Sequence, residues 1–255
     1  MKSSVLRIAG LTVEACGVVF DKDGTLVDFH RVWGPRMERS ANTLLEASGL
    51  GEDFLVHLYR TVGYEATTGN TLGQGPLATA PLQQLTVVVA SALFQHGLAW
   101  DRACELANHC VVPAMTAAPT PEEIAPRGNV ATALLKLIDA GCFVSVATTD
   151  NRAATEVMLR HLHIEDCFTS IHCGDDPGPV KPDTRVLDDI AQSQGVDLSQ
   201  LIMVGDTVSD MVMARNAGVC LGVGITGGAG SDEELAAHAD VLIKDISEIY
   251  PGATA

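Results

Sequence analysis

Two aspartates, Asp21 and Asp23, stand one residue apart in the stretch VVFDKDGTLVD, residues 18–28. Three β-prone apolar residues precede the pair, so the sequence predicts a buried strand that ends in a Gly–Thr turn carrying both carboxylates. Asp and Gly are common in ordinary turns. Carboxylates this close repel each other, however, and desolvation at a strand end strengthens the repulsion. A bound cation would relieve it.

Three other segments carry polar groups of the same kind. Thr148 closes the apolar run CFVSVATT, Lys181 lies in the turn GPVKPD, and GDTVSD, residues 205–210, follows LIMV directly. Each is ordinary alone: a lone lysine is usually solvated, and Asp and Ser favour helix N-caps, so Asp210 is expected to be partly structural. Together they place Asp206, Asp210, a hydroxyl and an ammonium group after three further strands.

The elements that must position these groups alternate strictly between strand and helix. We therefore predict an α/β fold with a doubly wound parallel sheet, in which all four strand ends lie at one edge. Hard oxygen ligands at that edge suit Mg²⁺, which prefers one or two carboxylates plus substrate phosphate. The predicted strands span 17–20, 142–149, 168–174, 200–206, 220–226 and 240–243, and the predicted helices span 129–141, 152–162, 184–195, 209–218 and 232–239.

Residues 29–125 interrupt this alternation with long helical patterns and little strand signal. We predict an inserted helical cap domain at 29–125, and a catalytic core made of 1–28 and 126–255. The Pro-rich segment 118–129 marks the exit from the insertion. The Gly- and Thr-rich segment from Thr67 to Pro76 is predicted to be a mobile specificity loop. Helical patterns within the cap span 35–48, 52–63, 81–97 and 101–115.

The order and spacing of these motifs resemble the haloacid dehalogenase-like hydrolase superfamily, and within it the phosphoglycolate phosphatase-like branch. DKDGTLVD is similar to motif I of that family, commonly DxDGTL, and Thr148 is similar to motif II. Lys181 in VKPD corresponds to motif III and GDTVSD to motif IV. A helical cap between motifs I and II also fits the resemblance, which covers nearly the whole chain.

The resemblance implies an Mg²⁺-dependent phosphatase that acts through an aspartyl phosphate. Asp21 would be the nucleophile, and Asp23 would protonate the leaving oxygen and later deprotonate water. The ion would be held by the Asp21 carboxylate, the backbone carbonyl of Asp23 and Asp206, with Asp210 farther out or orienting Lys181. The implied phosphate-binding groups are Lys181, Thr148, Thr149 and the amides around Gly24.

Arginines near the start of the cap suggest a second anion-binding feature. A solvated helix face is the commoner explanation for such residues, but Arg31, Arg36 and Arg39 lie close to the expected mouth of the site and could hold a substrate carboxylate or second phosphate. His30 and Trp33 could pack against the leaving group or cover the hinge. We therefore expect a small anionic phosphorylated metabolite, with phosphoglycolate, sugar phosphates and nucleoside monophosphates as candidates.

Several alternative activities remain or weaken at this point. A dehalogenase would not need Asp23, because halide leaves without a proton, and a phosphonatase would need a cap lysine, whereas residues 29–125 contain none. A phosphosugar mutase uses the same four motifs and stays open. A non-catalytic phosphate-binding or regulatory protein on this fold is the alternative from another class.

Two further patterns are weighed against their simpler explanations. GVGITG, residues 222–227, matches a dinucleotide-binding expression but lies outside an opening βαβ unit, so we interpret it as a core strand and its loop. A zinc site would need the crowded histidines and cysteines to converge, although they run from a helix into a strand. Those residues are His161, His163, Cys167, His172 and Cys173.

The overall composition bounds the partners. Sixteen basic against 32 acidic residues give a net charge of −16, which argues against binding nucleic acid or an anionic membrane surface. Seven scattered cysteines without a CxxC pair indicate reduced thiols, and no apolar run is long enough to span a membrane. We expect a cytoplasmic protein, with a homodimer as a possibility. Alternation along an extended segment predicts that Lys22 points away from the site.

Overall fold

Strand β3 (Gly17–Phe20) is buried along its whole length near the middle of a six-stranded sheet. In this computed structural model, which describes residues 2–252, the strand order is β10-β9-β8-β3-β6-β7 and every pairing is parallel. The predicted doubly wound parallel sheet is therefore confirmed. The other five strands are β6 (Phe143–Ala147), β7 (Ser170–His172), β8 (Leu201–Gly205), β9 (Leu221–Ile225) and β10 (Val241–Ile243).

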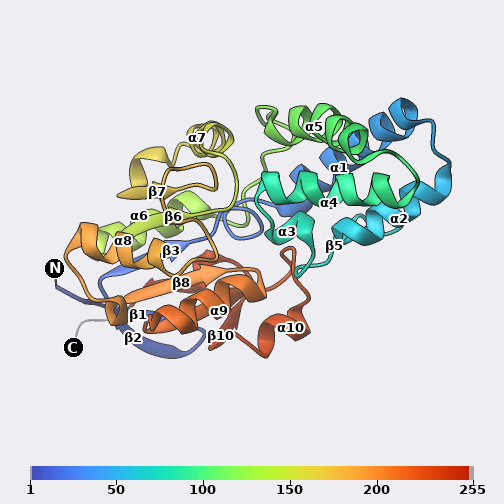
Figure 1. Cartoon of the computed structure of the whole chain (residues 1–255). Helices are drawn as coiled ribbons and strands as arrows, with labels where there is room; N and C mark the ends of the chain where they lie inside the picture. The colour runs from blue at the N-terminus through green and yellow to red at the C-terminus, as the bar shows by residue number, and fades with distance from the viewer. Residues whose placement is uncertain (1, 253–255) are drawn as a thin grey trace.

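Helices cover both faces of this sheet (Figure 1). Side chains of β3 alternate between the two faces, since Val18 and Phe20 join one apolar core while Val19 joins the other. Helices α6 and α7 pack into the first core, and α8 and α9 into the second. The core helices are α6 (Val130–Asp139), α7 (Arg152–His161), α8 (Arg185–Gln194), α9 (Val208–Ala217) and α10 (Asp232–Ala236), with short 3₁₀ turns at Glu165–Cys167, Leu198–Gln200 and Ile246–Glu248.

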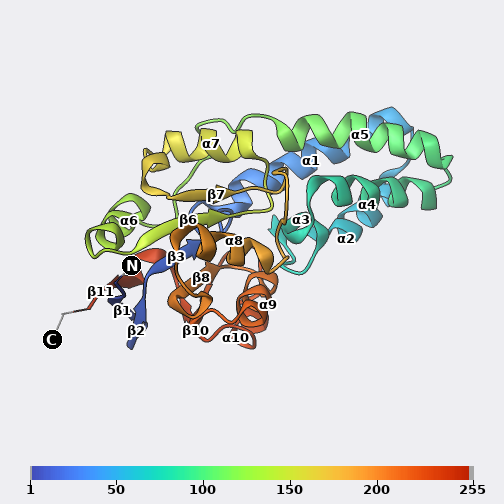
Figure 2. The same cartoon turned by 60° about the vertical axis from the view of Figure 1, so that its left-hand side comes forward.

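A second sheet, absent from the sequence prediction, lies under the N-terminal ends of the core strands. It is antiparallel and has the order β11-β1-β2, formed by β1 (Ser4–Ile8), β2 (Leu11–Ala15) and β11 (Ile249–Pro251). Leu6 and Ile8 are fully buried and join the first apolar core. Figure 2 shows this sheet at the end of the core remote from the inserted helices.

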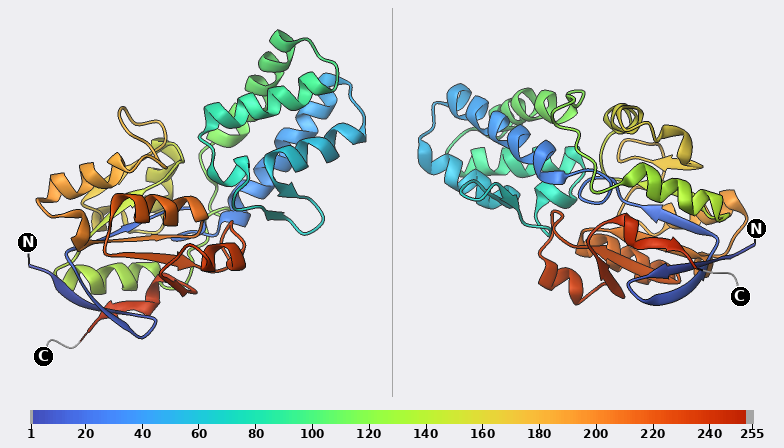
Figure 3. Two further views of the ribbon diagram at one scale, coloured as in Figure 1. Left: turned by 60° about the horizontal axis from the view of Figure 1, so that its bottom comes forward. Right: turned by 180° about the vertical axis from the view of Figure 1, so that it is seen from behind.

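The segment between β3 and β6 contains an independent helical unit. Its apolar residues form a core of their own, from Met37 to Met115, and Figure 3 shows the helices standing beyond one edge of the sheet. This matches the expected helical insertion, while its exact limits of 29–125 stay a prediction. The elements are α1 (Phe29–Ser48), α2 (Glu52–Val62), α3 (Pro76–Thr79), α4 (Leu82–Gln95), α5 (Trp100–Thr116) and the two-residue strands β4 (Tyr64–Glu65) and β5 (Asn70–Thr71).

Helix α1 begins earlier than its periodicity predicted. Asp28 is its N-cap, and the Asp28 side chain accepts a hydrogen bond from the backbone N–H of His30 at 3.0 Å. The helix therefore starts directly after the DKDGTLVD turn and continues through Pro35. This places the first two turns of α1 beside the carboxyl edge of the sheet. None of the helices within residues 2–252 is long and apolar enough to cross a membrane.

Candidate active site

Asp21 follows β3 directly, at the edge of the sheet between the ends of β6 and β8. Its backbone N–H donates to the carbonyl of Val204 at 2.8 Å, which continues the pairing with β8 for one more residue. The Lys181 Nζ atom lies 2.6 Å from Asp21 Oδ1 and 2.6 Å from Asp210 Oδ1. The structure thus brings together the first, third and fourth predicted motifs, although the chain separates them widely.

Three buried carboxylates converge at this edge. Oxygens of Asp21, Asp206 and Asp210 lie within 4.8 Å of one another, the one such cluster of metal-ligating side chains found in residues 2–252. Asp206 Oδ2 accepts a hydrogen bond from the Ala229 N–H at 2.6 Å. Asp206 Oδ1 is buried and has no hydrogen-bond partner within the described chain. Such an oxygen is costly unless it is paired, and an Mg²⁺ ion bound by this cluster would pair it.

The electrostatics of these carboxylates point the same way. Burial raises the pKa of Asp21 to about 6; the Asp210 and Asp23 carboxylates add to this rise, and the Lys181 ammonium opposes it. Burial, followed by the charges of Asp21 and Asp210, raises the pKa of Asp206 well above its ordinary value. Burial alone would lower the pKa of Lys181, but its two carboxylate partners raise it above the usual value. One buried ammonium group does not balance three carboxylates, so the site favours a further cation.

Gly24 makes the close approach of Asp206 possible. Its φ of +84° lies in the left-handed region, and a Cβ atom there would be 2.0 Å from Asp206 Oδ2. The predicted contribution of its backbone amide to phosphate binding does not match the structure. The Gly24 N–H donates to the carbonyl of Val27 at 2.7 Å, which closes the turn.

Asp210 combines a structural and an electrostatic role, as the sequence suggested. Thr207 is the N-cap of α9, its hydroxyl donates to Asp210 Oδ2 at 2.7 Å, and the two residues form a reciprocal capping box. The other carboxylate oxygen of Asp210 faces Lys181. Asp210 therefore fixes the Lys181 ammonium group beside Asp21.

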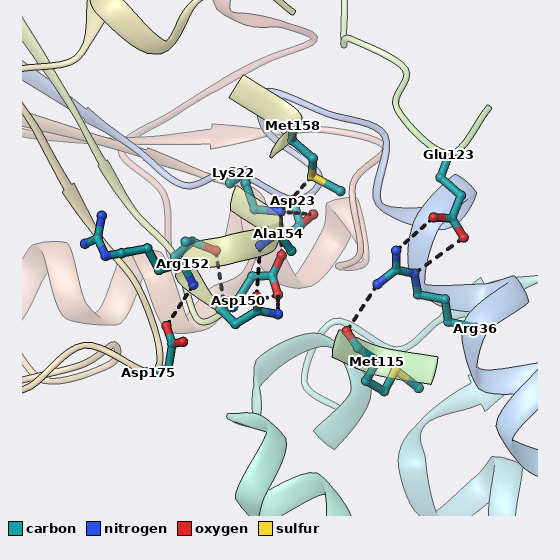
Figure 4. A network of polar contacts seen from close by, with 12 residues as sticks. Lys22, Asp23, Arg36, Met115, Glu123, Asp150, Arg152, Ala154, Met158 and Asp175 are labelled. Atoms are coloured by element: carbon teal, nitrogen blue, oxygen red, sulfur yellow. Dashed lines mark hydrogen bonds and ion pairs between the residues drawn. The ribbon is translucent and has the colours of Figure 1, made fainter. Parts of the chain in front are cut away.

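Lys22 does not point away from the site, contrary to the sequence prediction. Its side chain is fully buried, and Nζ lies 2.7 Å from the Asp23 carboxylate and 3.0 Å from Asp150 Oδ2 (Figure 4). Period-two alternation fails here because β3 ends at Phe20. The backbone then turns around the Lys22 carbonyl, which accepts from the amides of residues 25–27.

Asp150 is a site residue that sequence reasoning missed. Burial, followed by the nearby Asp23 charge, raises its pKa, while the Lys22 ammonium group counteracts this shift. Its N–H donates to Thr148 Oγ1 at 3.1 Å, so the residues after β6 form a compact turn. The available signal was an acidic residue two positions after the strand-end hydroxyl in VATTD.

A cavity of about 400 Å³ opens over these groups. Thr148 and Thr149, as predicted, line it together with Asp21, Asp23 and Lys181. Its opposite wall comes from α1, from α5 and from the segment 77–85. The predicted specificity loop, Thr67 to Pro76, is not part of that lining; its Gly73 instead packs against the backbone of Gly230 in the core.

The cap arginines do not form the expected anion-binding feature. Arg36 is 1% exposed, forms an ion pair with Glu123 at 2.8 Å and donates to the Met115 carbonyl at 3.1 Å (Figure 4). Arg39 is 58% exposed and pairs with the same glutamate. Arg31 is exposed and lies outside the cavity lining. The prediction that Arg36 contacts substrate is therefore wrong, because the guanidinium group joins α1 to the exit linker.

The remaining predicted features are placed as follows. Trp33 lines the cavity, whereas His30 Nε2 lies 3.0 Å from the Gly228 carbonyl at the hinge. Residues 222–225 of the GVGITG stretch belong to β9. The crowded histidines and cysteines of residues 161–173 do not form a metal-ligating cluster within the described chain.

Comparison with known proteins places this geometry in a family. The family model for haloacid dehalogenase-like hydrolase matches residues 17–218. A phosphoglycolate phosphatase of Agrobacterium fabrum is 28% identical over 242 residues, covering 91% of this chain and 90% of that protein. A phosphoglycolate phosphatase of Neisseria meningitidis is 33% identical over 129 residues, which span 49% of this chain and about half, 54%, of that relative.

The fold comparison agrees. A haloacid dehalogenase-like family hydrolase from Streptococcus pneumoniae superposes with a TM-score of 0.61 at 19% identity, covering 92% of this chain and 96% of that one. At this identity the match supports the fold alone. The family model spans both core segments and the insertion between them. The chain therefore belongs to the haloacid dehalogenase-like hydrolases, as an enzyme of the phosphatase type that resembles phosphoglycolate phosphatases.

Proposed function

We propose that this phosphatase hydrolyses a small phosphate monoester through an aspartyl phosphate formed on Asp21. The observation that carries the proposal is the position of Asp21 at the base of the cavity, with Lys181 2.6 Å from its carboxylate. A carboxylate at this place can attack phosphorus in line with the departing alcohol. Lys181 and Thr148 are positioned to hold the phosphoryl oxygens as negative charge develops on them.

Asp23 is the proposed acid and base. Its carboxylate lines the cavity next to Asp21, and the buried Lys22 ammonium group holds it there. In the first step Asp23 would donate a proton to the leaving oxygen as the P–O bond breaks. In the second step it would take a proton from the water that attacks the aspartyl phosphate, which restores both aspartates.

The carboxylate cluster supports an Mg²⁺ cofactor. Asp21 and Asp206, with Asp210 close by, would hold the ion, and the unpartnered Oδ1 of Asp206 is the oxygen most in need of it. The ion supplies charge neutralisation for the phosphoryl group. The Asp23 carbonyl stays a predicted further ligand.

The remaining features of the proposal concern setting. The substrate is a phosphorylated metabolite, not nucleic acid or membrane, because a net charge of −16 opposes polyanions. The seven cysteines include no disulfide within residues 2–252, which supports the proposed cytoplasmic location. A homodimer stays a prediction.

Phosphate release from a panel of monoesters tests the proposal. The panel contains phosphoglycolate, sugar phosphates and nucleoside 5′-monophosphates, each with Mg²⁺ and with excess chelator. We expect release with Mg²⁺ and little with chelator. Conversion of one phosphosugar into its isomer without net release would identify the mutase alternative, and binding without turnover would identify the non-catalytic one.

A further inference from the structure

The wall of the active-site cavity that faces the leaving group is apolar. Aromatic side chains come from Phe29 and Trp33 on α1, with ring centroids 6.4 Å apart. Aliphatic side chains come from Leu82 and Leu85 on α4, and Met115 lies on α5. Polar contacts on this side are limited to uncharged groups such as the exposed Gln84. This wall can bury apolar surface of a substrate but offers no charge.

The charges that line the cavity are almost all negative. Lys181 is the one cationic side chain among the lining residues of the described chain, and its ammonium group is already shared between Asp21 and Asp210. The aspartates that line the cavity are Asp21, Asp23, Asp150, Asp175 and Asp210. A second anionic group on a substrate would therefore meet carboxylates and apolar carbon. Burying an unpaired charge in such surroundings is strongly unfavourable.

Cations near the cavity are bound elsewhere. Arg36 is held by Glu123 and the Met115 carbonyl. Arg152 donates to both oxygens of Asp176 and to the Ile171 carbonyl. Neither guanidinium group lines the cavity, and releasing either would leave a carboxylate without its partner.

We propose that the substrate is a phosphate monoester of an uncharged alcohol with an apolar or aromatic body, rather than an ester with a second anionic group such as phosphoglycolate. The volume agrees: about 400 Å³ lies in the range of roughly 300–1,000 Å³ that holds drug-sized ligands, which is more than a two-carbon acid fills. This inference rests on the proposed phosphatase function and deepens it. Hydrolysis releases the neutral alcohol and inorganic phosphate, with water as the second substrate.

Steady-state kinetics on three esters test the inference. The full-length enzyme with Mg²⁺ is assayed on benzyl phosphate, on a nucleoside 5′-monophosphate and on phosphoglycolate, all of which release poor leaving groups. We expect kcat/KM for at least one of the first two to exceed that for phosphoglycolate by about tenfold or more, because the carboxylate lacks a cationic partner. A higher kcat/KM for phosphoglycolate would overturn the substrate class but leave the phosphatase function intact. Absence of turnover on all three would count against both, and against the phosphatase function first.

A pair of matched variants tests the charge argument directly. Gln84 and Gln95 lie on the same helix and are both exposed, but only Gln84 lines the cavity. Gln84→Lys is expected to raise kcat/KM for phosphoglycolate several-fold relative to benzyl phosphate, because it adds the missing cation. Gln95→Lys carries the same charge change outside the cavity and should leave the ratio unchanged. Equal ratios in the two variants would contradict the argument.

Discussion

Lys22 and Asp23 are sequence neighbours whose side chains form a buried ion pair, with 2.7 Å between the ammonium nitrogen and the carboxylate. Asp150 binds the same ammonium group from the turn after β6, and Met158 Sδ lies 3.1 Å from it on α7. Asp23 is therefore held in place by three elements besides its own turn. This matters because a general acid must be within hydrogen-bond reach of the leaving oxygen.

The first prediction concerns this positioning. Lys22→Met removes the ammonium group and leaves Asp23 and Asp150 without it. On an alkyl phosphate, whose leaving oxygen needs a proton, we expect kcat to fall roughly 10²-fold, the order of a general-acid contribution. On p-nitrophenyl phosphate, whose leaving group departs without a proton, the fall should be much smaller. The measurement is kcat for both substrates in the wild type and the variant.

Asp23→Asn is the reference for this experiment, since it removes the acid itself and should show the same dependence on leaving group. Asp150→Asn, which keeps the shape but weakens the ion pair with Lys22, should show a smaller loss of the same kind. Equal losses on both substrates in Lys22→Met would mean that Lys22 only stabilises the fold.

The second prediction concerns the cation. Asp206→Asn removes one of three buried negative charges, so the metal-free variant should unfold at a temperature equal to or above that of the metal-free wild type. Millimolar Mg²⁺ should raise the midpoint of the wild type by linkage and leave that of the variant unchanged. Thermal unfolding with Mg²⁺ and with chelator measures both effects.

Asp189→Asn is a suitable control for this comparison because Asp189 is exposed on α8. It makes the same chemical change away from the site, and its response to Mg²⁺ should equal that of the wild type. A wild-type response in Asp206→Asn would show that the ion binds elsewhere.

The third prediction separates two arginines that bind one glutamate. Arg36→Met breaks a buried pair with Glu123 and should lower the free energy of unfolding by about 3 kcal/mol. Arg39→Met breaks the exposed pair with the same residue and should cost less than about 1 kcal/mol. Urea unfolding of the two variants tests this order, and equal losses would contradict the structural role assigned to Arg36.

The fourth prediction is a pH dependence of stability at Glu123. Burial tends to raise the pKa of Glu123, but hydrogen bonds from Arg36, the Thr120 N–H and Arg39 outweigh it and lower the pKa to about 2 from an ordinary 4.5. A lowered folded-state pKa gives stability that is complete above about pH 4.5 and is lost as pH falls toward 2. The stability difference between the wild type and Glu123→Gln should therefore be constant from pH 7 to 5 and shrink at pH 3.5. A difference that grows on acidification would contradict this sign.

Much of the core fold was readable from the sequence because each buried strand and amphipathic helix carries its own periodicity. The six parallel strands and the gathering of Asp21, Lys181 and Asp206 at one edge follow from that pattern alone. The β11-β1-β2 sheet was missed because its strands are short and join the two ends of the chain. Pairing over that distance leaves no local signal.

The misplaced site residues have a common physical cause. Lys22 and Arg36 are charged, and single-sequence reasoning assigns charged side chains to solvent or to substrate. Both are buried because partners from distant segments, Asp150 and Glu123, neutralise them. Such pairing depends on tertiary structure, which motif spacing does not report.

The most direct test of the central claim is the fate of phosphate at Asp21. The wild-type enzyme, mixed with a hydrolysed ester and Mg²⁺ and then quenched in acid, should yield a peptide phosphorylated at Asp21. Asp21→Asn should yield none and should release phosphate more slowly by a factor of about 10³ or more, because the nucleophile is lost. Phosphate release by Asp21→Asn at the wild-type rate would contradict the account.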